Sequence, residues 1–278
     1  LKRIATIQDI SCLGKCSLTV ALPLISAMGS EACVIPTAVL STHTAGFSGY
    51  TFRDLTEDMP AILAHWEKEN LTFDSIYTGY LGSTEQIDYV KAIADSRLKA
   101  GGKLIVDPAM ADNGKLYPAF DDAYVQAMKT LCAKADVLLP NITEACLMTH
   151  TEIRLTEHTE AYIEQLLEAL SALTSGQIIL KGICFDPGRI GIAVHDAKSG
   201  TTEYYFTQKV EGSYHGTGDC FAAVLTGGVM QGLSPLEAAS LAADFVVESI
   251  RKTLPDREHF YGVRFEKALP MLTQRINR

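Results

Sequence analysis

Hydrophobic and polar positions along the chain follow two alternating periods. Short apolar runs rich in valine and isoleucine are typical of buried strands, and longer segments with apolar residues every three to four positions are typical of amphipathic helices. The predicted strands are residues 4–8, 31–40, 73–78, 103–106, 136–139 and 177–180, and the predicted helices are residues 18–28, 54–69, 84–100, 121–133, 156–173, 234–253 and one from about residue 265. This regular alternation predicts parallel strands joined by crossover helices, with helices on both faces of the sheet.

A second pattern interrupts this alternation late in the chain. Residues 189–195 and 202–208 alternate like antiparallel strands around a turn at 196–200, so the mostly parallel sheet should carry antiparallel edge strands. No repeat, low-complexity run or linker divides the sequence. We therefore expect residues 1–278 to form one three-layer α/β domain. A separate β-lid is not expected, because residues 29–41 resemble one buried strand.

Composition narrows the possible partners and locations. The 278 residues carry a formal charge of −9 and are 47% hydrophobic, which is enough for a large core and argues against a non-specific nucleic-acid surface. No apolar run reaches membrane-spanning length, and residues 1–7 resemble a strand more than a signal peptide. The seven cysteines are scattered without a Cys-x-x-Cys pair, which favours reduced, buried thiols in a cytoplasmic protein.

The clearest chemical signal is the turn of Gly216, Thr217, Gly218 and Asp219, directly before a small-residue apolar helix. Backbone N–H groups at a helix start lack partners inside the helix and carry its positive dipole end, so the turn is a candidate anion site. A carboxylate beside a phosphate is repelled unless it accepts the proton of a hydroxyl attacking phosphorus. An ordinary acidic first-turn residue is the structural alternative. Neither a dinucleotide fingerprint nor a Walker A loop fits the sequence.

Polar residues at other strand ends add to this signal, because the carboxyl ends of parallel strands line the ligand crevice of such sheets. Asp107 and Asp112 can hold a hydrated Mg²⁺ or simply order their loop. Asn141 and Glu144 have the spacing of a helix N-cap and its capping-box partner, which is compatible with a role of Glu144 near a metal. Lys181 can reach a phosphate as a point charge, or be a solvated turn lysine.

Taken in order, these motifs resemble the ribokinase-like superfamily, and within it the pyridoxal kinases, over nearly the whole chain. Gly-Thr-Gly-Asp at 216–219 and Asn-x-x-Glu at 141–144 mark the superfamily, and Thr-His-Thr at 42–44 and Thr-Gly-Tyr-Leu-Gly-Ser at 78–83 point to the vitamin B6 branch. The resemblance implies ATP- and Mg²⁺-dependent phosphorylation of the 5'-hydroxymethyl group of pyridoxal, pyridoxine or pyridoxamine. It leaves a K⁺ requirement open. A homodimer is expected, since symmetric pairs are the commonest assembly.

The resemblance also implies individual roles. Asp219 would be the base, and the amides of Gly216, Thr217, Gly218 and Asp219 would form the anion hole. The other implied contacts are Asp9, Thr44 and Tyr80 with the pyridine ring, Asn141, Lys181, Lys209 and Val210 with the nucleotide, and Asp107, Asp112 and Glu144 with Mg²⁺ directly or through water. Residues 209–214 would lie beside the adenine, and residues 41–50 and 113–119 would cover the pocket.

Two positions depart from the family pattern. Asp9 stands where many relatives have a serine that touches the vitamin. A carboxylate there can pair with a protonated pyridine nitrogen or with the amine of pyridoxamine, which suggests a preference for pyridoxamine. Ala111 replaces a glycine that is common after the Asp-Pro-x-Met run, and the geometry of that loop stays open.

Other functions remain as alternatives at this stage. A hydroxymethylpyrimidine kinase of the same superfamily is the nearest one, and a sugar kinase is disfavoured by the missing lid. From another class, the chain could be a non-catalytic B6- or nucleotide-binding protein, which the intact Gly-Thr-Gly-Asp disfavours. The expected partners are a B6 vitamer and ATP, with neither nucleic acid nor a membrane.

Overall fold

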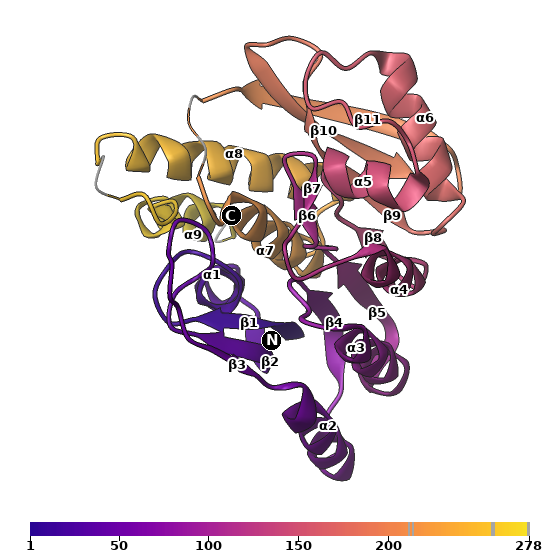
Figure 1. Ribbon diagram of the computed structural model, residues 1–278, viewed down its shortest axis with the longest axis vertical. Coiled ribbons are helices and arrows are strands. Elements are labelled where there is room, and N and C mark those ends of the chain that lie inside the picture. The colour runs from indigo at the N-terminus through magenta and orange to yellow at the C-terminus, as the bar shows by residue number, and fades with distance from the viewer. Residues whose placement is uncertain (211, 213, 257–258, 277–278) are drawn as a thin grey trace.

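A nine-stranded sheet forms the centre of the described part of the chain (Figure 1). The computed structural model describes residues 1–210, 212, 214–256 and 259–276. The strand order is β11-β10-β9-β8-β5-β4-β1-β2-β3. The strands are β1 (Arg3–Ser11), β2 (Glu31–Leu40), β3 (Phe52–Asp54), β4 (Phe73–Thr78), β5 (Leu98–Val106), β8 (Val137–Leu138), β9 (Gln177–Ile183), β10 (Arg189–Asp196) and β11 (Thr201–Gln208).

The strand directions confirm the predicted sheet type. The six strands β2, β1, β4, β5, β8 and β9 are parallel to one another. The strands β10 and β11 form an antiparallel edge on one side, as their alternating pattern predicts. At the opposite edge β3 pairs antiparallel with β2, which was not expected from the sequence.

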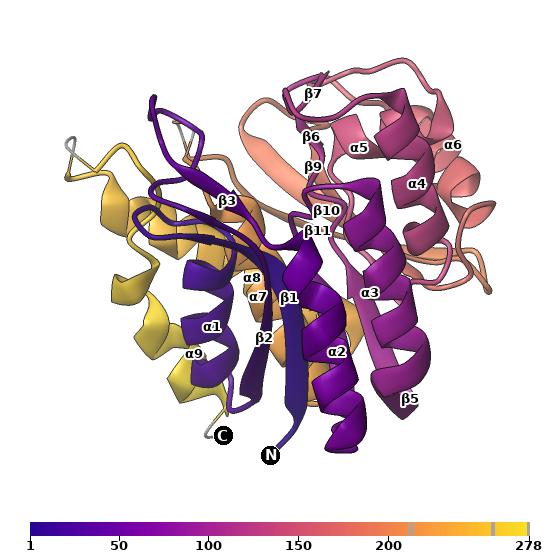
Figure 2. The same cartoon turned by 60° about the horizontal axis from the view of Figure 1, so that its bottom comes forward.

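Helices cover both faces of the sheet (Figure 2). One hydrophobic core lies between the sheet and α2, α3, α4, α5 and α6, and a second lies between the sheet and α1, α7, α8 and α9. Successive strand residues serve opposite cores, as Ile76 and Tyr77 of β4 do. The helices are α1 (Leu18–Ala27), α2 (Met59–Lys68), α3 (Thr84–Arg97), α4 (Asp122–Cys132), α5 (Ile142–Thr149), α6 (Glu160–Ser171), α7 (Thr217–Met230), α8 (Pro235–Thr253) and α9 (Leu269–Ile276).

Two predicted helices have different boundaries in the structure. The helix α3 ends at Arg97, before the predicted end at residue 100, because Leu98 is already extended and pairs with Phe73 of β4. The glycines at 101 and 102 therefore lie inside β5. The helix predicted at 54–69 begins only at Met59, after β3 and the 3-10 turn η1 (Thr56–Asp58). The Asp54 carboxylate accepts the Thr56 N–H at 2.8 Å, which stabilises this turn instead.

Smaller differences occur at other element ends. The helix α6 begins at Glu160 rather than at residue 156, because Thr159 is its N-cap. The strand β9 continues past the predicted end to Ile183, so Lys181 lies within a strand and not in a turn. A short hairpin of β6 (Ala111–Asp112) and β7 (Lys115–Leu116) occupies the segment whose geometry the sequence left open. The last segment begins with the 3-10 turn η2 (Phe265–Lys267), followed by α9.

The cysteines are all free thiols, as predicted, but they are not all buried. Cys12 is exposed because it lies directly after β1 in a surface loop, whereas the thiols of Cys132, Cys146, Cys184 and Cys220 are buried.

Within the described residues, no helix is both long and apolar enough to cross a membrane.

Candidate functional site

The predicted polar residues gather where the parallel strands end. Asp9 lies near the end of β1, Tyr80 follows β4, Asp107 follows β5 and Asn141 follows β8. Lys181 is near the end of β9 and forms an isolated bridge with Asn141. This edge is where an open α/β sheet forms its ligand crevice.

The start of α7 has an unusual local conformation. Gly216 is the N-cap, with a φ of 78° that side chains rarely adopt, and it makes no side-chain capping bond. A Cβ at Gly216 would overlap the carbonyl oxygen of Lys15, so this position requires glycine. A Cβ added at Gly218 would instead point into open space, with no neighbouring atom of another described residue within 4 Å. The turn thus offers backbone N–H groups at the positive end of the helix dipole.

Asp219 occupies the first turn of α7 and is half-buried. Burial, with the nearby charges of Asp107 and Asp9, raises the pKa of its carboxyl group to about 7, although the Ser17 backbone N–H and Lys181 act in the opposite direction. A carboxyl group with this pKa can accept a proton from a hydroxyl near neutral pH.

Lys181 and Asp107 form an ion pair inside the site. Their Nζ and Oδ2 atoms are 2.8 Å apart, and the side chains are only 14% and 10% exposed. Burial lowers the pKa of Lys181, but Asp107 and Glu144 more than offset this, so the pKa is raised and the lysine stays charged. The alternative of a solvated turn lysine is therefore wrong.

Glu144 and Asn141 form the predicted capping box at the start of α5. The two carboxylate oxygens of Glu144 accept the N–H groups of Met110 at 3.1 Å and of Asn141 at 2.9 Å. Burial and the charge of Asp107 nevertheless raise the pKa of Glu144 to about 8. Glu144 thus ties α5 to the segment after β5, and the Asn141 amide group donates to Ala111 O at 2.8 Å.

Asp112 lies apart from this buried group. It is exposed in β6, and its carboxylate accepts both the backbone and the side-chain N–H of Asn113. Within the described residues, no three histidine, cysteine, aspartate or glutamate side chains are placed to hold a metal ion together. The carboxylates of Asp107 and Glu144 are already engaged by Lys181 and by backbone amides, so they suit a water-mediated metal contact better than a direct one.

The residues predicted to contact the substrate ring are placed differently from one another. Asp9 is 6% exposed, and burial together with the nearby charge of Asp9 raises the pKa of Tyr80 to about 12, so these two side chains lie close together. Thr44 is exposed in the loop after β2. Lys209 and Val210 follow β11, and Lys209 is exposed. Residues 211 and 213 of the predicted adenine segment lie outside the described residues.

Tyr117 is a residue that the sequence reasoning missed. Although Tyr117 is 37% exposed, partial burial and the charges of Glu144, Asp112, Asp219 and Asp107 raise the pKa of its phenol, so the side chain lies near the acidic group in the loop after β7. Its backbone N–H donates to Met110 O at 2.9 Å. The only available signal was an aromatic residue in the predicted covering loop 113–119.

The predicted covering loop 41–50 is fixed by His43. The His43 ring accepts the Ala45 N–H at Nδ1, so its Nε2 carries the proton and donates to Tyr261 O at 2.9 Å. Phe47 in the same loop lies 5.4 Å from Phe260, ring centre to ring centre. The loop therefore packs against the segment after α8.

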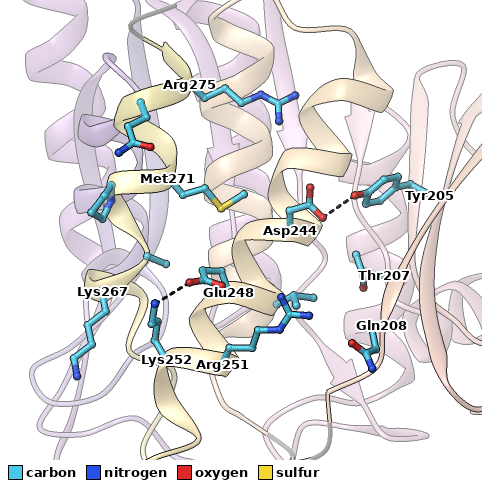
Figure 3. Close-up of a pocket in the computed structure, with 14 residues that line it drawn as sticks. Tyr205, Thr207, Gln208, Asp244, Glu248, Arg251, Lys252, Lys267, Met271 and Arg275 are labelled. Atoms are coloured by element: carbon cyan, nitrogen blue, oxygen red, sulfur yellow. Dashed lines mark hydrogen bonds and ion pairs between the residues drawn. The ribbon is translucent and has the colours of Figure 1, made fainter.

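A surface groove lies away from this site. It has a volume of about 680 Å³ and lies between β11, α8 and the segment of η2 and α9 (Figure 3). Its lining includes Tyr205, Asp244, Glu248, Arg251 and Lys252, and none of the residues predicted for chemistry. Tyr205 donates to Asp244 across it, and Glu248 pairs with Lys252 within α8. We therefore place the candidate site not in this groove but at the carboxyl ends of the parallel strands, where Asp219 at the start of α7 and the ion pair of Lys181 with Asp107 come together.

The chain is similar to known proteins over most of its length. Residues 22–263 match the family model described as phosphomethylpyrimidine kinase. A crystal structure of a Bacteroides thetaiotaomicron protein with pyridoxal is 35% identical, covering 98% of this chain and 96% of that chain, with a TM-score of 0.92. Pyridoxal kinase from Lactobacillus plantarum is 31% identical, with 99% and 97% covered and a TM-score of 0.91. The hydroxymethylpyrimidine/phosphomethylpyrimidine kinase of Bacillus subtilis is 27% identical over 232 residues, 78% of each chain.

Proposed function

Because the chain belongs to the phosphomethylpyrimidine kinase family, we propose that it transfers a phosphoryl group from ATP to the 5'-hydroxymethyl group of a vitamin B6 compound. The observation that carries this proposal is Asp219, a half-buried carboxyl group with a pKa of about 7 at an open helix start. It is supported by the relative that contains pyridoxal and by the Lactobacillus plantarum pyridoxal kinase.

In this reaction Asp219 would accept the proton of the substrate hydroxyl as its oxygen attacks the γ-phosphorus. The amides of Gly216, Thr217, Gly218 and Asp219 would donate to the oxygens of the transferred group, whose charge the helix dipole also stabilises. Neither contribution requires a covalent bond between protein and substrate. Catalysis of phosphoryl transfer usually depends on positioning and electrostatic stabilisation instead.

Lys181 and the acidic residues around it would bind the nucleotide and its Mg²⁺ ion. Lys181 would turn from Asp107 toward the nucleotide phosphates, Asn141 would lie beside them, and Lys209 and Val210 would border the adenine. A Mg²⁺ ion bound with ATP would neutralise phosphate charge. Asp107 and Glu144 would hold it through water, with Asp112 at the outer edge, because Mg²⁺ usually keeps several waters when it binds nucleotides. A K⁺ requirement stays open.

Asp9, Thr44 and Tyr80 would contact the pyridine ring of the substrate. Asp9 lies close enough to both Tyr80 and Asp219 for its charge to raise their pKa values, which supports this arrangement. Thr44 would reach the ring from the loop after β2.

We also propose that the protein is a cytoplasmic homodimer, an assembly for which the edge strand β3 with its half-exposed Phe52 offers a pairing surface.

Phosphorylation of hydroxymethylpyrimidine is the second candidate function. It is favoured by the family description and by the Bacillus subtilis relative. Both substrates carry a hydroxymethyl group on a nitrogen heterocycle, so the same base and anion site would serve either one.

One assay separates these functions. ATP consumption is measured in parallel with pyridoxal, pyridoxine, pyridoxamine, hydroxymethylpyrimidine and ribose, each with Mg²⁺. We expect turnover of B6 compounds with kcat/KM at least about tenfold above that of hydroxymethylpyrimidine, in the range by which a pocket distinguishes related ligands. Preferred turnover of hydroxymethylpyrimidine would replace the B6 assignment, and binding without any turnover would indicate a non-catalytic protein.

A further inference from the structure

Asp9 lies at an irregular point of the central strand β1. Gln8 pairs with Pro36 of β2 and Ile10 pairs with Val39, so Asp9 alone faces two residues of the neighbouring strand. The additional residue belongs to β2, and irregularities of this kind are common beside active sites. The Asp9 side chain lies on the same face of β1 as that of Ser11, two residues further on.

The buried carboxylate of Asp9 has no cationic partner among the described residues. It is 6% exposed, and it accepts hydrogen bonds from the hydroxyl groups of Ser11, at 3.4 Å, and Ser17, and from its own backbone N–H. His43 is close enough to lower the pKa of Asp9, but its two ring nitrogens are engaged by the Ala45 N–H and the Tyr261 carbonyl oxygen. A buried carboxylate without an ion-pair partner is costly, and a cationic ligand would reduce that cost.

The surroundings of Asp9 place this carboxylate inside the candidate site. Ser17 donates to both carboxylates, through its side chain to Asp9 and through its backbone N–H to Asp219, and the charge of Asp9 also raises the pKa of Asp219 and of Tyr80. A cation bound by Asp9 would therefore lie next to the hydroxyl group that Asp219 deprotonates.

From this juxtaposition, and resting on the proposed function, we infer that Asp9 selects pyridoxamine by binding its protonated 4'-aminomethyl group. The three B6 compounds differ only at the 4' position, and only pyridoxamine carries an ammonium there near pH 7, since alkyl amines titrate well above neutrality. The 4' and 5' carbons are attached to neighbouring ring atoms. A side chain beside Asp219 is thus within reach of the 4' group, whereas the ring nitrogen is para to the 4' substituent and faces the other way.

The test compares vitamers and Asp9 variants at constant pH. We expect the wild-type kcat/KM for pyridoxamine to exceed those for pyridoxal and pyridoxine by about tenfold or more, the lower limit of the discrimination that pockets show between related substrates. Asp9→Asn, which keeps the shape but not the charge, should lower the value for pyridoxamine about 10- to 100-fold and leave pyridoxal within about threefold. Asp9→Ser should show the same loss of preference. Asp88→Asn is the matched control, because its carboxylate pairs with Lys91 on the exposed face of α3.

Several outcomes would overturn the inference. One is a wild-type kcat/KM for pyridoxal equal to or above that for pyridoxamine, which leaves the B6 kinase proposal intact. Another is an unchanged pyridoxamine preference in folded Asp9→Asn. The wild-type comparison requires no variant, so it decides the matter even if both substitutions prevent folding. If the wild type phosphorylates hydroxymethylpyrimidine and no vitamer, the proposed function itself fails, and this result is distinct from a reversed vitamer order.

Discussion

At the residue scale, the titration of Asp219 links burial to chemistry. A carboxyl group in water has a pKa near 4 and is a weak base for an alcohol. Burial and the neighbouring carboxylates raise the pKa of Asp219 to about 7, so it is a stronger base that is still largely ionised just above neutral pH. The free-enzyme kcat/KM should therefore rise with pH, with a midpoint near 7.

Replacing Asp219 provides the direct test. Asp219→Asn keeps the size of the side chain and removes the base, so kcat should fall by about 10²- to 10⁴-fold. Steady-state kinetics with saturating ATP measure this, and nucleotide binding by calorimetry controls for folding. Turnover within about threefold of wild type would exclude Asp219 as the base.

The same variant should change stability in a pH-dependent manner. Because the folded-state pKa of Asp219 lies above its unfolded value, its stabilising contribution is complete below about pH 4 and is lost as pH rises through about 7. Asp219→Asn should therefore raise Tm relative to wild type at pH 8 more than at pH 5, as measured by thermal unfolding. An equal Tm difference at both pH values would contradict the pKa assignment.

The sequence predicted some site contacts but not others. The Asn141–Glu144 capping box follows from local spacing and is present. The ion pair of Asp107 with Lys181 joins residues 74 positions apart, and no local pattern specifies such a contact. Tyr117 was missed for the same reason, since only the folded chain brings it near the acidic group.

At the element scale, the start of α7 depends on two glycines with unequal constraints. Gly216→Ala should disrupt the turn, because the new Cβ meets Lys15 and the φ of 78° is unfavourable. Gly218→Ala is the matched control, since open space surrounds that position. We expect a lower Tm and at least about a hundredfold loss of kcat in Gly216→Ala only, the order of magnitude for removing an oxyanion donor. Equal behaviour of the two variants would show that the turn is not constrained as described.

The element boundaries show where sequence patterns lose their information. The ends of α3 and α2 were misplaced where strand pairing competed with helix continuation, as at Leu98 and at β3. Short strands such as β3 and the β6–β7 hairpin carry too few residues for a periodic signal. The long amphipathic segments were predicted correctly because their apolar stripes bury against a sheet.

At the scale of the whole molecule, the sheet separates two cores that the sequence could indicate only by strand alternation. The sequence predicted the helices on both faces but not which helix covers which face, because crossover direction is a property of the folded chain. The edge strand β3, with Phe52 49% exposed, leaves one side of the sheet open.

The proposed homodimer is tested by mass. Sedimentation equilibrium should give twice the 30.2 kDa chain mass. Phe52→Glu should shift the particle toward the monomer if β3 is the pairing surface, because a charge on an edge strand opposes pairing. Arg53→Glu, at the adjacent exposed position, serves as a comparison for the effect of charge alone. A monomeric wild type at micromolar concentration would refute the assembly.

The ion pair between Lys181 and Asp107 has a consequence for the resting protein. In the absence of nucleotide, the ammonium group is already neutralised from within, so stray anions such as sulfate or free phosphate encounter no unpaired lysine at this point. A polyphosphate accompanied by its own divalent cation can instead exchange partners with both members of the pair. Such an arrangement would make the site bind simple inorganic anions weakly while it could still bind the nucleotide.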